Sequence, residues 1–149
     1  MEQNVYYPPE KLQKEMCKFL FKFAATKGTS NKSLGKAFGD CFKSVMEKPA
    51  KIIKTFSNDN KEIKKIKKNH NRGNDFLYLL KQSEKETEMF CFLRHLRNVI
   101  AHGQLKEDDT ETKFILEDID YYDKKKLTAY GIISKDKISN VINSYLQIK

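Results

Sequence analysis

The residues of this chain best suited to chemistry lie close together in its second half. Four residues separate Arg97 from His102, and Asn98 directly follows the arginine. An arginine stays positively charged at any ordinary pH, so it can bind a phosphate and offset the charge that develops on it. A histidine titrates near neutral pH and can therefore transfer protons. Together these residue types suit the cleavage of a phosphodiester bond.

The motif lies at the end of an apolar run that predicts a central helix. Ser83 is followed three residues later by Glu86, which matches a capping box, so we expect the helix to begin at Ser83. Gly103 is a typical residue to end it, which leaves His102 at the helix end. The apolar positions recur at helical spacing, and they are Phe90, Leu93, Leu96 and Ile100. A polar strip, which holds the motif, is predicted to face a groove or an interface.

The segment Arg97-Asn98-Val99-Ile100-Ala101-His102 resembles the Arg-x(4–6)-His signature of the HEPN superfamily, including its polar residue directly after the arginine. The resemblance implies a mainly α fold, a HEPN-like helical bundle. The strand-like sequence after the motif helix would then be a small β-hairpin or strand elaboration. It also implies a homodimer with the two motifs at the interface.

The function implied is that of a metal-independent endoribonuclease that cleaves single-stranded RNA by attack of the 2′-OH. Such enzymes act as toxins or phage-defence effectors, so an antitoxin or another regulatory protein is a possible partner. The catalytic residues would be Arg97, His102 and Asn98, with no metal and no cofactor. Many relatives are inactive, and the alternative is a non-catalytic HEPN module for dimerisation or RNA binding.

Three residues near the motif allow more than one interpretation. Asn98 could orient His102 or the substrate, or it could cap the helix end. Arg94 lies one turn before Arg97, so it could contact a second RNA phosphate or pair with Glu86 or Glu88. His95 points away from the polar strip and is interpreted as structural.

A net charge of +9 predicts a polyanionic partner, and RNA, DNA and an acidic membrane surface all qualify. A lysine-rich surface that serves solubility is the alternative. Residues 57–75 form a basic polar loop or arm, expected either to be solvated or to contact phosphates. Ile63 and Ile66 could dock one turn of helix there. The expected RNA-binding lysines are Lys64, Lys65, Lys67 and Lys68.

The remaining elements follow from hydrophobic periodicity and turn residues. We expect helices over 10–25, across the stripe from Leu34 to Met46, and after Asn74-Asp75 in a short segment that carries Phe76 to Leu80. Residues 113–120 have strand character and are predicted to pair with 127–133. Ser134 is expected to cap a last helix that extends to about Gln147. No repeat or linker divides the chain, which predicts a single domain over 1–149.

Aromatic and cysteine residues complete the expectations. Tyr121, Tyr122 and Tyr130 could stack on unpaired bases, or they could pack. Cys17, Cys41 and Cys91 are widely spaced in apolar patterns, which predicts buried reduced thiols and a cytoplasmic protein. The sequence has no apolar stretch long enough for a transmembrane span, and its first residues lack the features of a secretory signal.

Overall fold

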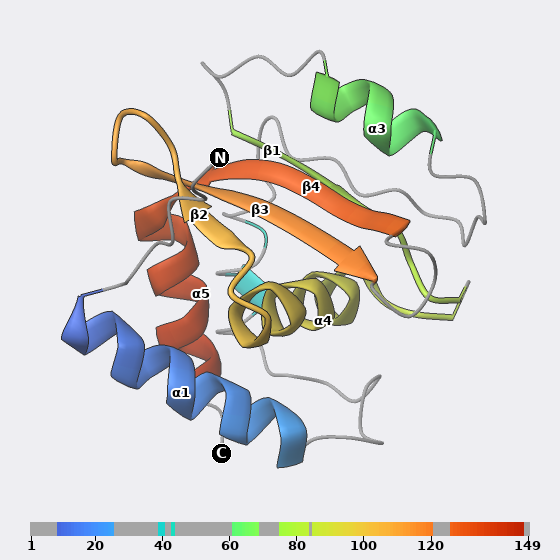
Figure 1. Ribbon diagram of the computed structural model, residues 1–149. Helices are drawn as coiled ribbons and strands as arrows, with labels where there is room; N and C mark the ends of the chain where they lie inside the picture. Colours follow the sequence, from blue (N-terminus) through green and yellow to red (C-terminus); the bar gives the residue numbers. More distant parts are fainter. Residues whose placement is uncertain are drawn as a thin grey trace.

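The computed structural model describes residues 9–25, 39–40, 43, 61–68, 75–83, 85–120 and 126–147. The elements in these ranges are, in chain order, α1 (Glu10–Ala25), α3 (Lys61–Lys68), β1 (Phe76–Leu79), α4 (Glu88–Ala101), β2 (Leu105–Glu107), β3 (Lys113–Asp120), β4 (Lys126–Ser134) and α5 (Lys135–Leu146). The strands form one antiparallel sheet in the order β1-β4-β3-β2 (Figure 1). The expectation of a mainly α helical bundle is therefore wrong, because a sheet forms the centre of the described fold.

The sheet forms because its strands carry apolar residues on both faces. On β3, Phe114 and Leu116 belong to one buried cluster, whereas Ile115 and Ile119 pack against a second. Successive side chains of a strand point to opposite faces, so both faces of this sheet need a cover. The predicted pairing of 113–120 with 127–133 is confirmed, and β4 extends it at both ends.

The prediction of a short helix over Phe76 to Leu80 is wrong, because these residues form strand β1. Leu77 and Leu79 pack on one face of the sheet, and Tyr78 packs on the other. Gly131 of β4 lies opposite Leu77. A Cβ atom on Gly131 would lie 2.5 Å from the Phe76 carbonyl oxygen, so the absent side chain permits β1 to approach.

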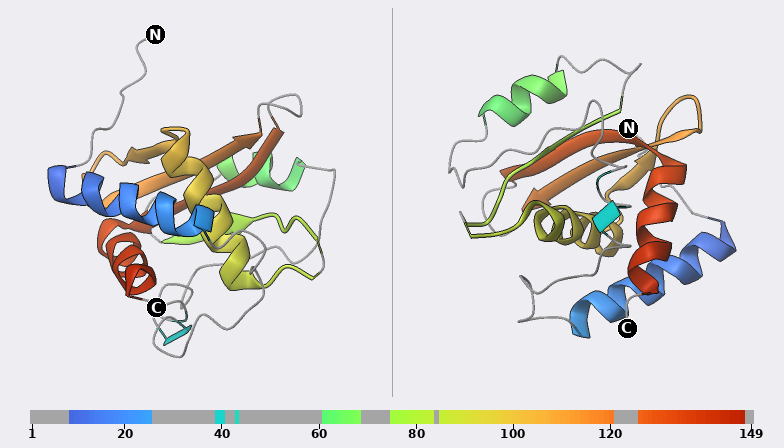
Figure 2. Two further views of the ribbon diagram at one scale, coloured as in Figure 1. Left: turned by 90° about the horizontal axis from the view of Figure 1, so that it is seen from below. Right: turned by 180° about the vertical axis from the view of Figure 1, so that it is seen from behind.

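Helices cover the two faces of the sheet unequally. Figures 1 and 2 show α1, α4 and α5 on one face and α3 on the other. The larger cluster includes Phe92, Leu96, Phe114 and Leu116 on the face of α4. The smaller cluster packs under α3 and includes Ile63 and Tyr130.

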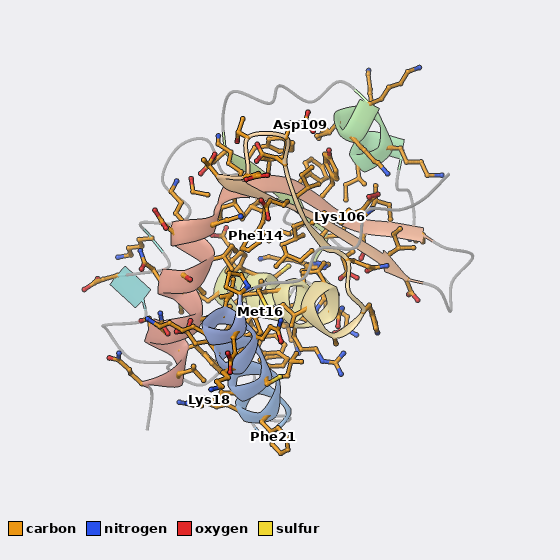
Figure 3. The ribbon with its side chains drawn as sticks, turned by 60° about the vertical axis from the view of Figure 1, so that its left-hand side comes forward. Met16, Lys18, Phe21, Lys106, Asp109 and Phe114 are labelled. Atoms are coloured by element: carbon orange, nitrogen blue, oxygen red, sulfur yellow. The ribbon has the colours of Figure 1, made fainter. Side chains whose placement is uncertain are left out.

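The first and last described helices confirm the expected ranges and pack against each other. Phe19 of α1 meets Tyr145 of α5, with ring centroids 5.2 Å apart. Figure 3 shows Met16 turned toward the body of the protein, while Phe21 projects from the far end of α1. The residues expected to be buried by the last helix are buried, namely Ile138, Val141, Ile142 and Tyr145.

Within the basic loop or arm expected over residues 57–75, Lys61–Lys68 form helix α3, which is longer than the single turn expected there. Ile63 is buried and Ile66 packs beside it, as expected of two apolar anchors. Tyr130 is only 3 % exposed, so base stacking on this ring is contradicted. Tyr121 and Tyr122 lie outside the described residues, as does most of the helix expected between Leu34 and Met46.

Two free cysteines are described, and they differ in environment. Cys91 is buried as predicted, but Cys17 is exposed, so the expectation of burial is wrong for Cys17. Cys41 lies outside the described residues. Within the described ranges, no helix has the length and apolar character needed to cross a membrane.

Asp75 joins the start of β1 to the junction between β4 and α5. Its Oδ2 atom accepts hydrogen bonds from the backbone N–H of Ser134 (3.1 Å) and from the Ser134 hydroxyl (2.9 Å). Lys113 and Lys137 pair with the same carboxylate at 2.8 and 3.2 Å. Burial by itself would raise the pKa of Asp75, but these hydrogen bonds lower it to about 2. Ser134 precedes α5 as predicted, yet its hydroxyl holds Asp75 and makes no side-chain cap bond to the helix.

A depressed carboxyl pKa contributes stability that is present above the unfolded-state pKa and is lost as the pH falls through the folded-state value. We therefore predict that Asp75→Asn lowers the free energy of unfolding by about 2 kcal/mol at pH 7. The loss should shrink as the pH falls from about 4 to about 2, as measured by denaturant unfolding across that range. Asp136→Asn, at an exposed position of α5, is the control. A difference that is independent of pH would contradict this role for Asp75.

Candidate active site at the end of helix α4

Helix α4 begins at Glu88, later than predicted. Thr87 is its N-cap, and the Thr87 hydroxyl oxygen accepts a hydrogen bond from the backbone N–H of Phe90 at 3.2 Å. The predicted start at Ser83 with Glu86 as the capping-box partner is wrong. The Glu86 carboxylate is instead buried, where it accepts hydrogen bonds from Arg94 and from the backbone N–H of Gln82.

The other end of α4 is where the sequence places it. His102 is the C-cap, and its backbone N–H donates to the Asn98 carbonyl at 3.0 Å. Gly103 has a φ of +65°, which ends the helix in a conformation that glycine adopts without strain. The chain then turns through Gln104 into β2, so His102 stands at an exposed corner of the protein.

The motif residues lie together at this exposed end. Arg97 and His102 are exposed and Asn98 is half-buried, while Val99 beside them packs in the core. The Arg97 Nη1 atom donates to the Asn98 side-chain oxygen at 3.0 Å. Among the described residues, neither Arg97 nor His102 forms an ion pair. Both side chains are therefore accessible to a large anionic substrate.

The Asn98 side chain connects the exposed arginine to the sheet. Its Nδ2 atom donates to Oδ2 of Asp118 on β3 at 3.0 Å, while its oxygen accepts from Arg97. The Asn98 side chain therefore contacts Arg97 and Asp118, one on the surface and one in the core. Asn98 contacts His102 through the backbone, where the His102 N–H donates to the Asn98 carbonyl.

Asp118 also holds His95, which is completely buried. His95 Nδ1 lies 2.7 Å from Asp118 Oδ2, and His95 Nε2 lies 2.8 Å from the Leu80 carbonyl oxygen. A carbonyl can only accept, so His95 Nε2 donates to Leu80, while Nδ1 is bound by Asp118. This leaves no ring nitrogen free for proton transfer, in line with the structural interpretation of His95. Burial alone would raise the pKa of Asp118, but its bond to His95 lowers it below its usual value.

A β-bulge sets the two acceptors for His95 side by side. The β3–β4 register shifts between Asp118 and Ile119, which leaves Thr128 as the extra residue of β4. The Thr128 carbonyl accepts from the Leu80 N–H at 3.0 Å, and its hydroxyl donates to the Asp118 backbone carbonyl at 3.1 Å. Bulges commonly re-aim side chains near functional sites. Here Thr128 bonds to both Leu80 and Asp118 and so fixes them relative to each other.

Arg94 forms a second buried pair beside the first. Its Nε atom lies 2.7 Å from Glu86 Oε2, and its Nη2 atom donates to the Leu80 carbonyl at 3.0 Å. This is the internal partner considered as the alternative to an RNA phosphate. Burial by itself would raise the pKa of Glu86, but the hydrogen bond from Arg94 lowers it. Burial, together with the nearby Glu86 charge, raises the pKa of the Cys91 thiol to about 12, so this cysteine is not a nucleophile.

The structure does not bring the predicted RNA-binding lysines to the motif. Lys64, Lys65, Lys67 and Lys68 are exposed on α3, on the opposite face of the sheet from α4. Lys67 pairs with Glu117, a residue of β3 directly before Asp118. Glu117 thus pairs with a lysine of α3 on one face of the sheet, and Asp118 bonds to Asn98 on the other.

Asp118 and Glu86 were not identified as site residues from the sequence. A signal for Asp118 was present, because it continues the alternation of Phe114 and Leu116 and must therefore point into the core. A carboxylate at such a position requires a buried partner, and His95 is the residue it meets. Glu86 had been considered as a partner of Arg94, but the capping-box pattern placed it at the start of the helix.

No group of three or more His, Cys, Asp or Glu side chains that could hold a metal ion occurs in the part of the chain that the structure describes. The motif side chains at the end of α4 are a cation, an amide and an exposed imidazole. An arginine can bind a phosphate, and a histidine at the same end of a helix can transfer a proton near it.

Comparison with known protein families matches residues 5–148 to the family described as HEPN pEK499 p136. Comparisons with curated proteins and with solved structures found no match. HEPN membership carries, in general terms, a nuclease or RNA-binding role. The matched region covers nearly the whole chain and includes Arg97 and His102. The chain belongs to the HEPN pEK499 p136 family.

Proposed function

We propose that this protein is a metal-independent endoribonuclease that cleaves single-stranded RNA. One observation carries the proposal. Arg97 and His102 are exposed at the same end of α4, while Asn98 between them is anchored to the buried Asp118. The arrangement presents a cation and a proton-transfer group to solvent on a rigid support, as phosphodiester cleavage requires.

In the proposed reaction, the His102 imidazole removes the proton of a ribose 2′-OH. The 2′ oxygen then bonds to the neighbouring phosphorus, and the bond from phosphorus to the 5′ oxygen breaks. A protonated imidazole supplies the proton that the departing 5′ oxygen needs. Arg97 binds the phosphate and stabilises the extra negative charge of the transition state. Each proton transfer contributes about 10²- to 10⁴-fold to the rate, and the dependence on the 2′-OH selects RNA over DNA.

A homodimer would supply the second imidazole. One His102 cannot serve as base and acid in the same step, and His95 has no free ring nitrogen. Two chains that meet at the exposed ends of their α4 helices would place two His102 and two Arg97 around one phosphate. A two-fold axis through the motif satisfies this requirement with one self-complementary surface.

The biological role we propose is that of a toxin or phage-defence effector acting on RNA in the cytoplasm. An exposed site of this kind would need an antitoxin or another regulatory protein to restrain it. A partner that covers Arg97 and His102 would do so directly.

We predict that the purified protein cleaves single-stranded RNA in excess EDTA and leaves 2′,3′-cyclic phosphate and 5′-OH ends. His102→Ala should lose cleavage, because the proton-transfer group is removed, and should keep RNA binding. Product ends are identified by their response to phosphatase and kinase treatment. Loss of cleavage in EDTA with recovery in Mg²⁺ would contradict the mechanism. RNA binding without any cleavage would favour a non-catalytic HEPN module.

We also predict that the active species is a dimer with shared histidines. Dimers that pair one wild-type chain with one His102→Ala chain, isolated with two different affinity tags, should retain almost no activity. Two independent sites would instead retain about half of the activity, because each would hold its own acid and base. Sedimentation velocity establishes that the mixed species is a dimer. Half activity, or a fully active monomer, would contradict the composite site.

The lysines of α3 have a separate proposed role. Because they lie across the sheet from the motif, an RNA strand would reach both by passing around the edge formed by β2, which directly follows the motif helix. Lys106 of β2 pairs in register with Ile115, a residue of the α3 side, so Lys106 lies along this path. These charges would add phosphate contacts without taking part in cleavage.

Changing Lys64, Lys65 and Lys68 together to Gln should weaken RNA binding and reduce its salt dependence. Each lost phosphate contact lowers the slope of log K against log salt by about 0.7 for a single strand. Single-turnover cleavage at saturating RNA should stay near the wild-type rate. The matched control changes Lys11, Lys14 and Lys18 of α1 to Gln, which removes equal charge elsewhere. If both triple variants weaken binding equally, α3 has no special role.

A further inference from the structure

A continuous series of hydrogen bonds runs from the buried sheet to the exposed motif. Asp118 Oδ2 accepts from His95 at 2.7 Å and from Asn98 Nδ2 at 3.0 Å, and the Asn98 oxygen accepts from Arg97 at 3.0 Å. Asp118 is only 3 % exposed and Arg97 is exposed, so the series crosses from the core to the surface. Its members come from β3 and α4, two elements that are separated in the chain by β2.

The chemistry of the two ends fixes the orientation of the amide in the middle. An ionised carboxylate only accepts hydrogen bonds, and a guanidinium only donates them. Asn98 can satisfy both neighbours only with its nitrogen toward Asp118 and its oxygen toward Arg97. Asp118 in turn is held in its charged form by His95, whose second ring nitrogen donates to the Leu80 carbonyl. The direction of the amide is thus dictated from inside the protein.

This series matters because Arg97 has no other anchor among the described residues. An exposed arginine samples many rotamers, and binding a phosphate requires that it give up most of them. A guanidinium held at one N–H by Asn98 keeps its remaining donors for a phosphate, with less freedom to lose on binding. Such preorganisation favours the transition state without new contacts to the substrate.

We propose that Asp118, supported by His95, is a positioning residue for RNA cleavage. It acts through the Asn98 amide, which in turn holds the Arg97 guanidinium in place for the scissile phosphate. This inference rests on the proposed endoribonuclease function, and it assigns a role to a strand residue that lies outside the Arg97–His102 motif. The buried carboxylate makes no contact with RNA, so it is not a catalytic residue.

The test changes Asn98 and leaves Asp118 and His95 themselves unchanged, and thermal unfolding of each variant checks that the fold is preserved. Asn98→Ala removes both links of the side chain. Asn98→Asp is nearly isosteric and keeps an oxygen for Arg97, but it lacks the N–H that Asp118 holds. If Asp118 positions the arginine, both variants should slow saturated single-turnover cleavage by about 10- to 100-fold, with RNA affinity little changed. An Asn98→Asp enzyme with the wild-type rate would show that only the local contact between residues 97 and 98 matters.

A double-mutant cycle separates positioning from general damage. In the Arg97→Ala background, Asn98→Asp should cause no further loss, because its effect passes through the arginine. An equal loss in both backgrounds would overturn the proposal. Glu107→Gln is the matched control. It removes another carboxylate of the sheet, one that pairs with Lys135 at 3.0 Å and has no link to the motif, and it should leave the cleavage rate unchanged.

A measurement on the free protein keeps this inference separable from the proposed function. ¹⁵N relaxation of the Arg97 Nε–H group reports the rigidity of the guanidinium without RNA or catalysis. The group should be ordered in the wild-type protein and mobile in both Asn98 variants. Equal mobility in all three proteins would overturn the proposal, whether or not RNA is cleaved. Ordered wild-type Arg97 in a protein that cleaves no RNA would overturn the endoribonuclease function and leave the positioning of Arg97 established.

Discussion

The arrangement of the motif depends on the buried hydrogen bond between Asp118 and His95. A buried carboxylate is costly to remove from water without a hydrogen-bonded partner, so each residue of this pair requires the other. The pair also fixes geometry. Asp118 belongs to β3, His95 belongs to α4, and the second ring nitrogen of His95 binds the Leu80 carbonyl at the end of β1. These two bonds fix both the rotation of helix α4 about its axis and its distance from the sheet.

That constraint determines what the helix presents to solvent. With His95, Leu96 and Val99 facing the core, Arg97 and the end of the helix must face outward. Gly103 then ends the helix so that His102 remains exposed. The buried polar network lies on one side of α4 and the exposed motif on the other, and the Asn98 side chain connects them. The sheet is therefore the support of the candidate site, although the family resemblance led us to expect a mainly α bundle with only a small β-hairpin or strand elaboration.

Local sequence patterns predicted the elements whose pattern is long or regular. Helices α1 and α5 and the β3–β4 hairpin follow from periodicity, and Gly103 marks the end of α4. Strand β1 could not be predicted in this way. The short apolar run around Leu77 fits a helix or a strand equally well, and pairing with β4 across Gly131 decides between them. The start of α4 was misplaced for a similar reason, because Glu86 pairs with Arg94 within the fold.

In the candidate site, too, local sequence patterns predicted some residues, and the tertiary fold determined the others. Arg97, Asn98 and His102 are adjacent in sequence, so their spacing alone marked them. Asp118 lies twenty residues beyond Asn98, and only the fold of β3 against α4 brings the two side chains within 3.0 Å. The lysines of α3 were marked by charge, but charge does not say on which face of a sheet a helix will lie. The motif was predicted because its residues are close in sequence. Asp118 was missed because it is distant in sequence from the residue that it holds.

The central claim is that the end of α4 cleaves RNA through the ribose 2′-OH. It is tested most directly with a short single-stranded RNA in which the mapped cleavage position carries one 2′-deoxy sugar. The account predicts that cleavage at that position disappears, while cleavage of the unmodified RNA continues and the affinity for both is equal. Continued cleavage at the deoxy position would contradict it, because the attacking oxygen would then come from elsewhere.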